Sequence, residues 1–356
     1  MNLDDLERLK RIDTQNMLGE IDGLPDQLAG AWALGQKQPL PSVVASRLSR
    51  VVIAGLGGSA IGGDLLAAWC GPSAKVPVIV HRDYGLPGFA QGTDTLVIAS
   101  SHSGNTEETL DAFEAALNKD CSTLAVATGG ELARRAQETN APVWLFGHRG
   151  QPRAAIGFSF GLLLALFARL QLIPDPSTDL AEAVEAMRKV REKIGADVPA
   201  ALNPAKRYAG QLMGRWVTVF GAGLMAPVAR RLKTQINEIA KAGANFEILP
   251  EADHNALAGT LHPEEVLMPR MMNLFLRSPS DHPRNRKRLD LTKQAFMLQG
   301  LNTDFLDARG RSPLANMWTQ ILFGDYMAYY LAMGYGVDPT PVEALVSFKD
   351  SLRAKS

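Results

Sequence analysis

The sequence predicts an α/β protein with two doubly wound parallel sheets, each forming an αβα sandwich. Three observations support this prediction. Short apolar runs alternate with segments of helical period, as expected for parallel strands covered by helices on both faces. A glycine-containing turn follows the first predicted strand of each half of the chain. At 356 residues, the chain is also longer than the roughly 250–300 residues at which a single core stops growing.

The first half is predicted to contain a run of parallel strands, because its apolar segments are short and rich in β-branched residues. A helix-like segment separates most of them, which favours crossover connections. Residues 1–48 precede the strands and are predicted to form a peripheral helical segment, with prolines as breaks. The predicted strands span residues 51–54, 77–80, 96–99, 123–126 and 143–146.

The second half repeats the opening pattern of the first. Residues 215–220 lead into a glycine-containing turn and a helix, just as residues 50–54 do. The repetition predicts an internal duplication, although two unrelated strand–turn–helix units would give the same pattern. A charged helical segment flanked by prolines lies between the halves. We therefore divide the chain into a first domain over residues 49–173, a linker helix over 174–205 and a second domain over 206–356.

Composition argues against several partners and compartments. The formal net charge is zero, so no nucleic acid or membrane surface is an expected partner. Cys70 and Cys121 show neither metal-ligand spacing nor a disulfide framework, and the N-terminus is charged throughout. The most apolar stretch, residues 156–168, is shorter than the roughly 20 residues that span a bilayer. A soluble protein of the reducing cytoplasm is expected.

The turn after the first predicted strand, GLGGSAIGGD at residues 55–64, is a candidate phosphate-binding segment. Its glycines allow close backbone approach, and the next helix N-terminus presents free N–H groups. The same pattern fits a dinucleotide site, with Ala60 in its last position and Asp83 downstream to accept a ribose hydroxyl. A tight turn that binds no ligand also remains possible on this pattern alone.

A serine-rich loop, SSHSGNT at residues 100–106, gives a more specific signal. Its hydroxyls gather between a predicted strand and a predicted helix, where they could bind the oxygens of one phosphate. A dinucleotide fold does not need this second anion loop. One or two of the hydroxyls are expected to cap the helix, but capping alone would need only one.

Residues 233–259 hold candidate proton-transfer groups. Glu238 lies beside an inward-facing helical stripe, and His254 lies in a polar loop after a predicted strand. Glutamate and histidine are the usual groups that move protons near neutral pH. Spacing alone favours a solvated helix residue at Glu238 and an ordinary loop histidine at His254. Likewise, Arg153 could cap the next helix, and Lys349 could be a solvated residue of the last helix.

Four segments together resemble the bifunctional phosphoglucose/phosphomannose isomerases, which belong to the sugar-isomerase (SIS) group. The resemblance runs from about residue 49 to residue 352, and the serine loop is its most specific SIS feature. Two departures are a histidine at His102, where tyrosine is commoner, and the sequence DHNAL around His254. The segments are GLGGSAIGGDLL, SSHSGNTEETL, QINE followed by LPEADHN, and GDYMAYYLAMGYGVDPTPVE.

The resemblance implies two SIS-type subdomains, no cofactor and a homodimer. The implied reaction is reversible isomerisation of glucose 6-phosphate, and of mannose 6-phosphate, to fructose 6-phosphate through a cis-enediol. Glu238 would be the base and Arg153 would lie near the reacting carbons. Lys349 and His254 would open the sugar ring, and the neighbouring subunit would contribute His254. The implied phosphate-binding residues are Gly58, Ser59, Ser101, Ser103 and Thr106.

Two other functions remain open from the sequence. A non-catalytic phosphosugar-sensing SIS protein would keep the serine loop, but it would not need four catalytic side chains together. An NAD-dependent oxidoreductase would leave the serine loop unexplained.

We predict that activity requires no metal ion, because the six histidines include no HxH or HExxH spacing. Dialysis against a strong chelator should leave the rate of glucose 6-phosphate formation from fructose 6-phosphate unchanged. A loss of activity that added zinc restores would contradict this prediction.

Overall fold

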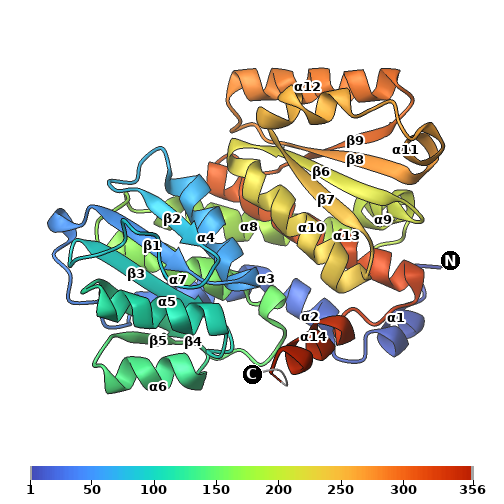
Figure 1. Ribbon diagram of the computed structural model, residues 1–356. Helices are drawn as coiled ribbons and strands as arrows, with labels where there is room; N and C mark the ends of the chain where they lie inside the picture. The colour runs from blue at the N-terminus through green and yellow to red at the C-terminus, as the bar shows by residue number, and fades with distance from the viewer. Residues whose placement is uncertain (1, 354–356) are drawn as a thin grey trace.

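A computed structural model describes residues 2–353 and contains two parallel β-sheets, each with helices on both faces (Figure 1). The predicted α/β fold with two doubly wound sheets is therefore confirmed. None of the helices within residues 2–353 has the length and apolar character needed to cross a membrane.

The first sheet has five parallel strands in the order β2-β1-β3-β4-β5. This order places a topological switch point between β1 and β3, so the loops at their carboxyl ends diverge and leave a crevice. Both predicted phosphate segments follow these two strands. The strands are β1 (Arg50–Ala54), β2 (Val78–His81), β3 (Thr95–Ser101), β4 (Ser122–Ala127) and β5 (Val143–Leu145).

Helices of the first half cover both faces of this sheet (Figure 1). Helix α7 is almost wholly apolar and buried, and it packs against α3 and α4. The predicted N-terminal helical segment forms three helices, the third of which completes this layer. The helices are α1 (Leu6–Ile12), α2 (Met17–Asp22), α3 (Leu24–Gly35), α4 (Gly57–Cys70), α5 (Glu107–Asn118), α6 (Gly130–Glu138) and α7 (Ile156–Arg169).

The second sheet has the order β7-β6-β8-β9, which repeats the order of the first four strands. This match supports the predicted internal duplication. Its strands are β6 (Trp216–Ala222), β7 (Ala244–Leu249), β8 (Met271–Arg277) and β9 (Asn302–Asp307). Its helices are α9 (Pro204–Leu212), α10 (Ala226–Ala240), α11 (Glu264–Arg270), α12 (Pro283–Leu298), α13 (Pro313–Tyr335) and α14 (Glu343–Arg353).

Helices join the two halves into one packed body. The predicted linker helix, α8 (Ser177–Ile194), packs against α3 of the first half and α13 of the second. Helix α10 in turn contacts both α13 and α4. A single cluster of buried apolar side chains therefore runs through both halves, from Val51 in β1 to Leu274 in β8. The exact domain boundaries stay a prediction.

A buried ion pair links α10 to α13. Arg231 donates to a carboxylate oxygen of Asp325 at 2.6 Å, and the two side chains are 3% and 6% exposed. The side-chain amide of Gln235 donates to the other carboxylate oxygen at 2.9 Å. Burial raises the pKa of Asp325, and the adjacent Arg231 opposes that shift. Because both charges are desolvated, each depends on its partner.

We predict that Asp325→Ala lowers the free energy of unfolding by about 3–5 kcal/mol, because it leaves Arg231 buried without its counter-charge. Replacing both partners by apolar residues, Arg231→Met with Asp325→Leu, should recover much of the loss. Arg311→Ala is the control, since its side chain is 94% exposed and its ion pair with Glu182 is long at 3.7 Å. Urea unfolding measures all three. A loss from Asp325→Ala as small as that of the control would show that the pair is not structural.

Candidate active site

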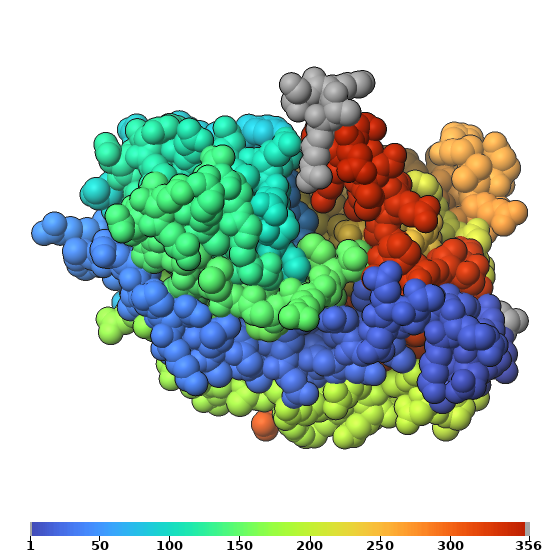
Figure 2. Space-filling view, turned by 90° about the horizontal axis from the view of Figure 1, so that it is seen from below, coloured from blue at the N-terminus to red at the C-terminus, as the bar shows by residue number. Residues whose placement is uncertain are grey.

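A cleft of about 1030 Å³ lies at the carboxyl ends of β1 and β3, where the strand order reverses. Its walls are the turn after β1, the serine loop, a short 3-10 helix (Pro152–Ala154), the end of α10, and α14. In Figure 2, α14 in red stands beside a recess whose opposite wall is the blue-green and green part of the first half. The two halves of the chain therefore share one cleft.

The turn after β1 brings the N-terminus of α4 to this cleft. Gly57 begins the helix with a φ of 53°, a conformation that favours glycine. A Cβ atom on Gly58 would lie 2.7 Å from the carbonyl oxygen of Pro152, so glycine lets α4 approach the segment that carries Arg153. Among the described residues, no side chain caps the start of α4. Its first N–H groups and its positive dipole end are thus available to an anion.

The serine loop presents hydroxyls at the N-terminus of α5. Thr106 and Ser103 line the cleft, whereas Ser101 is buried directly behind Thr106, with 2.9 Å between their hydroxyl oxygens. Thr106 holds the N-cap position of α5 but makes no capping hydrogen bond. The expectation that one or two hydroxyls cap this helix is wrong for Thr106, because its hydroxyl pairs with Ser101 instead. Ser59, on α4, lines the same wall and accepts from the His102 N–H at 3.2 Å.

Arg153 lies at the base of the cleft and is 4% exposed. Its Nη2 donates to the carbonyl oxygen of Pro339 at 2.8 Å and to that of Thr340. Its Nη1 lies 3.6 Å from a carboxylate oxygen of Glu238. Burial lowers the pKa of Arg153 while Glu238 opposes the shift, and a guanidinium stays charged in proteins. Arg153 does not cap α7, whose N-cap has no side-chain hydrogen bond.

Glu238 approaches Arg153 from the last turns of α10 and lines the cleft. Its side chain is 31% exposed, so it is neither a freely solvated helix residue nor a fully buried one. Lys241 fixes this end of the helix by donating to the backbone oxygens of Glu238 at 3.0 Å and Asp338 at 2.7 Å. Burial, with a contribution from Arg153, lowers the pKa of Lys241 to about 8.

Of the other two predicted catalytic residues, Lys349 and His254, only one lies in the cleft. Lys349 lines the cleft from α14, whereas His254 is exposed and does not line it. Asp253 fixes the histidine loop by accepting from Arg288 at 2.6 Å and from Thr292 at 2.7 Å, both on α12. The chain therefore does not bring its own His254 to its own cleft.

Some contributors to the cleft were not predicted. The carbonyl groups that bind Arg153 belong to residues 339 and 340, and the side chains of Gln15 and Gln151 also form part of the wall. Prolines at positions 339 and 341 indicate an extended segment with free carbonyls. No sequence signal, however, shows which side chain they meet.

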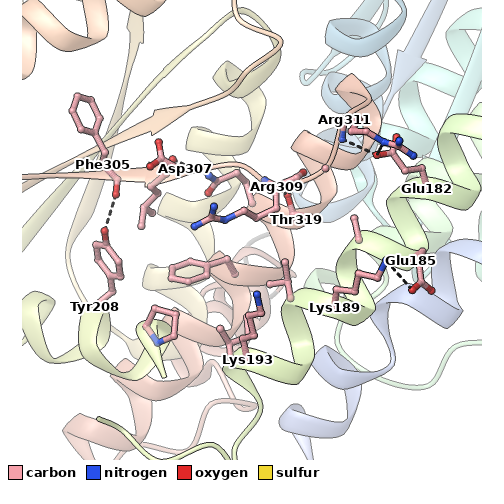
Figure 3. A pocket seen from close by; sticks show the side chains of 18 residues that line it. Glu182, Glu185, Lys189, Lys193, Tyr208, Phe305, Asp307, Arg309, Arg311 and Thr319 are labelled. Carbon is pink, nitrogen blue, oxygen red and sulfur yellow. Dashed lines mark hydrogen bonds and ion pairs between the residues drawn. The ribbon is translucent and has the colours of Figure 1, made fainter. Parts of the chain in front are cut away.

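A second cavity, of about 810 Å³, lies between α8, α9 and the end of β9 (Figure 3). Its acidic side chains already have partners. Glu182 accepts from the backbone N–H groups of residues 311 and 312, and Asp307 binds Arg277 through both carboxylate oxygens. Glu185 pairs with Lys189 at 3.5 Å. We therefore place the candidate active site in the cleft that holds Arg153.

Comparison with known proteins identifies the family. A family model described as the bacterial phospho-glucose isomerase C-terminal SIS domain matches residues 201–352. The chain is 39% identical to the bifunctional phosphoglucose/phosphomannose isomerase of Caldicellulosiruptor bescii, over 94% of this chain and 98% of that protein. The chain belongs to the bifunctional phosphoglucose/phosphomannose isomerase family. The Aquifex aeolicus member is 33% identical over 85% of this chain and 90% of its own length.

Solved structures show the same fold. A glucose-6-phosphate isomerase-like protein from Thermus thermophilus superposes with a TM-score of 0.63 at 21% identity, covering 96% of this chain and 98% of that one. A hypothetical protein from the same organism gives a TM-score of 0.72 at 16% identity, covering 98% and 94%. The two sheets are thus the two SIS-type subdomains expected from the sequence motifs.

We predict that Ser101→Ala combined with Thr106→Ala weakens binding of 6-phosphogluconate, a phosphosugar acid that cannot isomerise, at least tenfold. The pair removes the Thr106 hydroxyl that would contact a charged phosphate, a contact of about 1.5–3 kcal/mol, and the Ser101 hydroxyl that orients it from behind. Calorimetric titration measures the affinity, and Thr139→Ala, on an exposed hydroxyl outside the cleft, is the control. Unchanged affinity in the folded double variant would exclude this loop as the phosphate site.

Proposed function

We propose that the protein catalyses the reversible isomerisation of glucose 6-phosphate and mannose 6-phosphate to fructose 6-phosphate in the cleft around Arg153. The observation that carries the proposal is a buried guanidinium beside a half-buried carboxylate, in one cleft with two free helix N-termini. A non-catalytic phosphosugar sensor would leave Arg153 and Glu238 without a role. Both relatives named above are bifunctional phosphoglucose/phosphomannose isomerases, which supports the same activity.

The phosphate would occupy the end of the cleft formed by the first half. The N-termini of α4 and α5 converge there and direct N–H groups and positive dipole ends toward an anion. Hydroxyls of Ser59, Ser103 and Thr106 would donate to phosphate oxygens, and Ser101 would orient Thr106 from behind. This remote binding energy positions the sugar carbons for reaction.

Glu238 would transfer the proton between C2 and C1. It removes the C2 proton of the open-chain aldose, which leaves a cis-enediolate. A proton passes from O2 to O1 of this intermediate, and Glu238 returns its proton to C1 to give the ketose. The sugar is oxidised at C2 and reduced at C1, so the reaction balances without an external oxidant or cofactor. Arg153 lies beside Glu238 and would stabilise the negative charge that develops on the enediolate oxygens.

Ring opening needs a proton donor and acceptor at O5 and O1, and we assign this step to Lys349 and His254. Lys349 lines the cleft from α14. His254 is exposed on a fixed loop outside its own cleft, which supports its contribution to the cleft of a neighbouring subunit in a homodimer. Cytoplasmic location fits two buried free cysteines and stays a prediction.

We predict that Glu238→Gln lowers the isomerisation rate by about 10²–10⁴-fold, because the amide keeps the size of the side chain but cannot accept the proton. Affinity for 6-phosphogluconate should change far less, since the phosphate end is untouched. In deuterated water, the wild type should exchange the C2 hydrogen of glucose 6-phosphate during turnover, and the variant should not. Glu251→Gln is the control, because Glu251 lies in the loop of His254 and does not line the cleft. A near-normal Glu238→Gln together with an inactive Glu251→Gln would assign the base to Glu251.

We predict that mixing inactive Glu238→Gln and His254→Ala subunits restores activity. A site shared between subunits receives both wild-type residues in one of the two clefts of a mixed dimer. Complementation is measured after subunit exchange has been verified with differently tagged chains. No recovery in verified mixed dimers would mean that each site is built within one chain.

A further inference from the structure

A hydrogen-bonded chain of three side chains ends at the wall of the cleft. His102 lines the cleft within the serine loop, and its Nε2 lies 2.9 Å from Nδ1 of His148. His148 follows β5, and its Nε2 lies 3.0 Å from a carboxylate oxygen of Glu20 on α2. Residues far apart in the sequence are thus joined from the N-terminal helices to the substrate cleft.

These hydrogen bonds between Glu20, His148 and His102 determine which nitrogen of His102 carries a proton. A carboxylate only accepts, so His148 must donate to Glu20 through Nε2–H. With only this one proton on the His148 ring, its Nδ1 offers a lone pair, to which His102 donates through its own Nε2–H. The Nδ1 atom of His102 is consequently left without a proton, as a hydrogen-bond acceptor.

Packing fixes the two rings in these orientations. His102 contacts Phe146 edge to face at 5.8 Å between ring centroids, and His148 contacts Phe158 at 6.0 Å. The His148 side chain is only 7% exposed. Glycine at position 150 leaves room for both side chains, because a Cβ atom there would lie 2.5 Å from Glu20 and 2.9 Å from His148.

The free nitrogen of His102 remains accessible. Within residues 2–353, no protein group forms a hydrogen bond with His102 Nδ1, and this atom is not among the buried polar atoms that lack a partner. Burial is the main cause that lowers the pKa of His102 to about 4, so the ring stays neutral near pH 7 and is a weak base. These properties suit hydrogen-bond acceptance and not proton transfer.

We propose that His102 Nδ1 accepts a hydrogen bond from a hydroxyl of the bound phosphosugar, and that His148 and Glu20 hold it in this acceptor form. His102 is then a substrate-contacting specificity residue, whereas His148 and Glu20 are positioning residues. The proposal rests on the assignment of the cleft as the phosphosugar site.

The test compares a sugar-bearing ligand with inorganic phosphate. His102→Phe keeps the aromatic shape but removes both nitrogens, so KM for fructose 6-phosphate should rise roughly 3- to 10-fold with a smaller change in kcat. The inhibition constant of inorganic phosphate should not change. His102→Asn places an amide oxygen near the position of Nδ1 and should recover part of the loss. His282→Asn, at the exposed start of α12, is the matched histidine control.

The positioning residues have a separate readout. His148→Phe should raise KM in the same direction, and the double variant with His102→Phe should be no worse than His102→Phe alone, because both act through one hydrogen bond. ¹⁵N spectra of histidine-labelled protein should show His102 Nδ1 unprotonated, with a shift when 6-phosphogluconate binds. The signal is assigned by its absence in His102→Phe.

Three results would overturn the proposal. An unchanged KM in His102→Phe would remove the sugar contact, and an equal loss for inorganic phosphate would mean that His102 only shapes the loop. A proton found on Nδ1 of His102 would mean that this atom donates, and that the hydrogen bond between His102 and His148 runs in the opposite direction. The Ser101→Ala/Thr106→Ala variant separates this failure from that of the cleft. If that variant binds 6-phosphogluconate normally, the cleft assignment fails and His102 fails with it; if it binds weakly, only the role of His102 is refuted.

Discussion

The buried charge of Arg153 is the constraint on which the rest of the site depends. A guanidinium in this position needs hydrogen-bond acceptors and a counter-charge, since an unpaired buried charge is strongly unfavourable. Carbonyls of residues 339 and 340 bind it and thereby place the start of α14. Its own carbonyl oxygen accepts from Arg231 at 3.2 Å, and Arg231 is held by Asp325. Glu238 supplies the remaining counter-charge, so the proposed base is positioned by the same cation that would stabilise its product.

The duplicated halves have taken different roles. In the first half, the loops after β1 and β3 leave two helix N-termini open to the cleft. In the second half, the loop after β8 also carries serines, but Ser278 and Ser280 both bond to the side-chain oxygen of Asn316, at 2.9 and 2.7 Å. The carboxylate of Asp281 accepts a hydrogen bond from the Ser278 N–H at 2.8 Å. This carboxylate therefore takes the backbone donor that an external anion would need. The second half instead contributes Glu238 and Lys349, so the reacting carbons would lie at the junction.

Local sequence patterns predicted the fold and much of the cleft, because they depend on local chemistry. Apolar runs predicted the strands, and the strand order then brings the two glycine- and serine-rich loops together. Spacing alone could not decide whether Glu238 is solvated, since that depends on Arg153 from the other half. The same limit applies to Thr106, whose hydroxyl pairs with Ser101 in place of capping α5. His148 and Glu20 lie 128 positions apart, and nothing near either residue indicates their contact.

The most direct test of this account is a crystal structure with a phosphorylated hydroxamic acid that mimics the enediolate. The account predicts the phosphate at the N-termini of α4 and α5, within hydrogen-bond distance of Ser59 and Thr106. The hydroxamate oxygens should lie on Arg153, with the carboxylate of Glu238 facing the carbon that would carry the transferred proton. An analogue bound in the cavity between α8 and β9 would contradict the account. So would a phosphate in the serine loop with the reacting end directed away from Arg153.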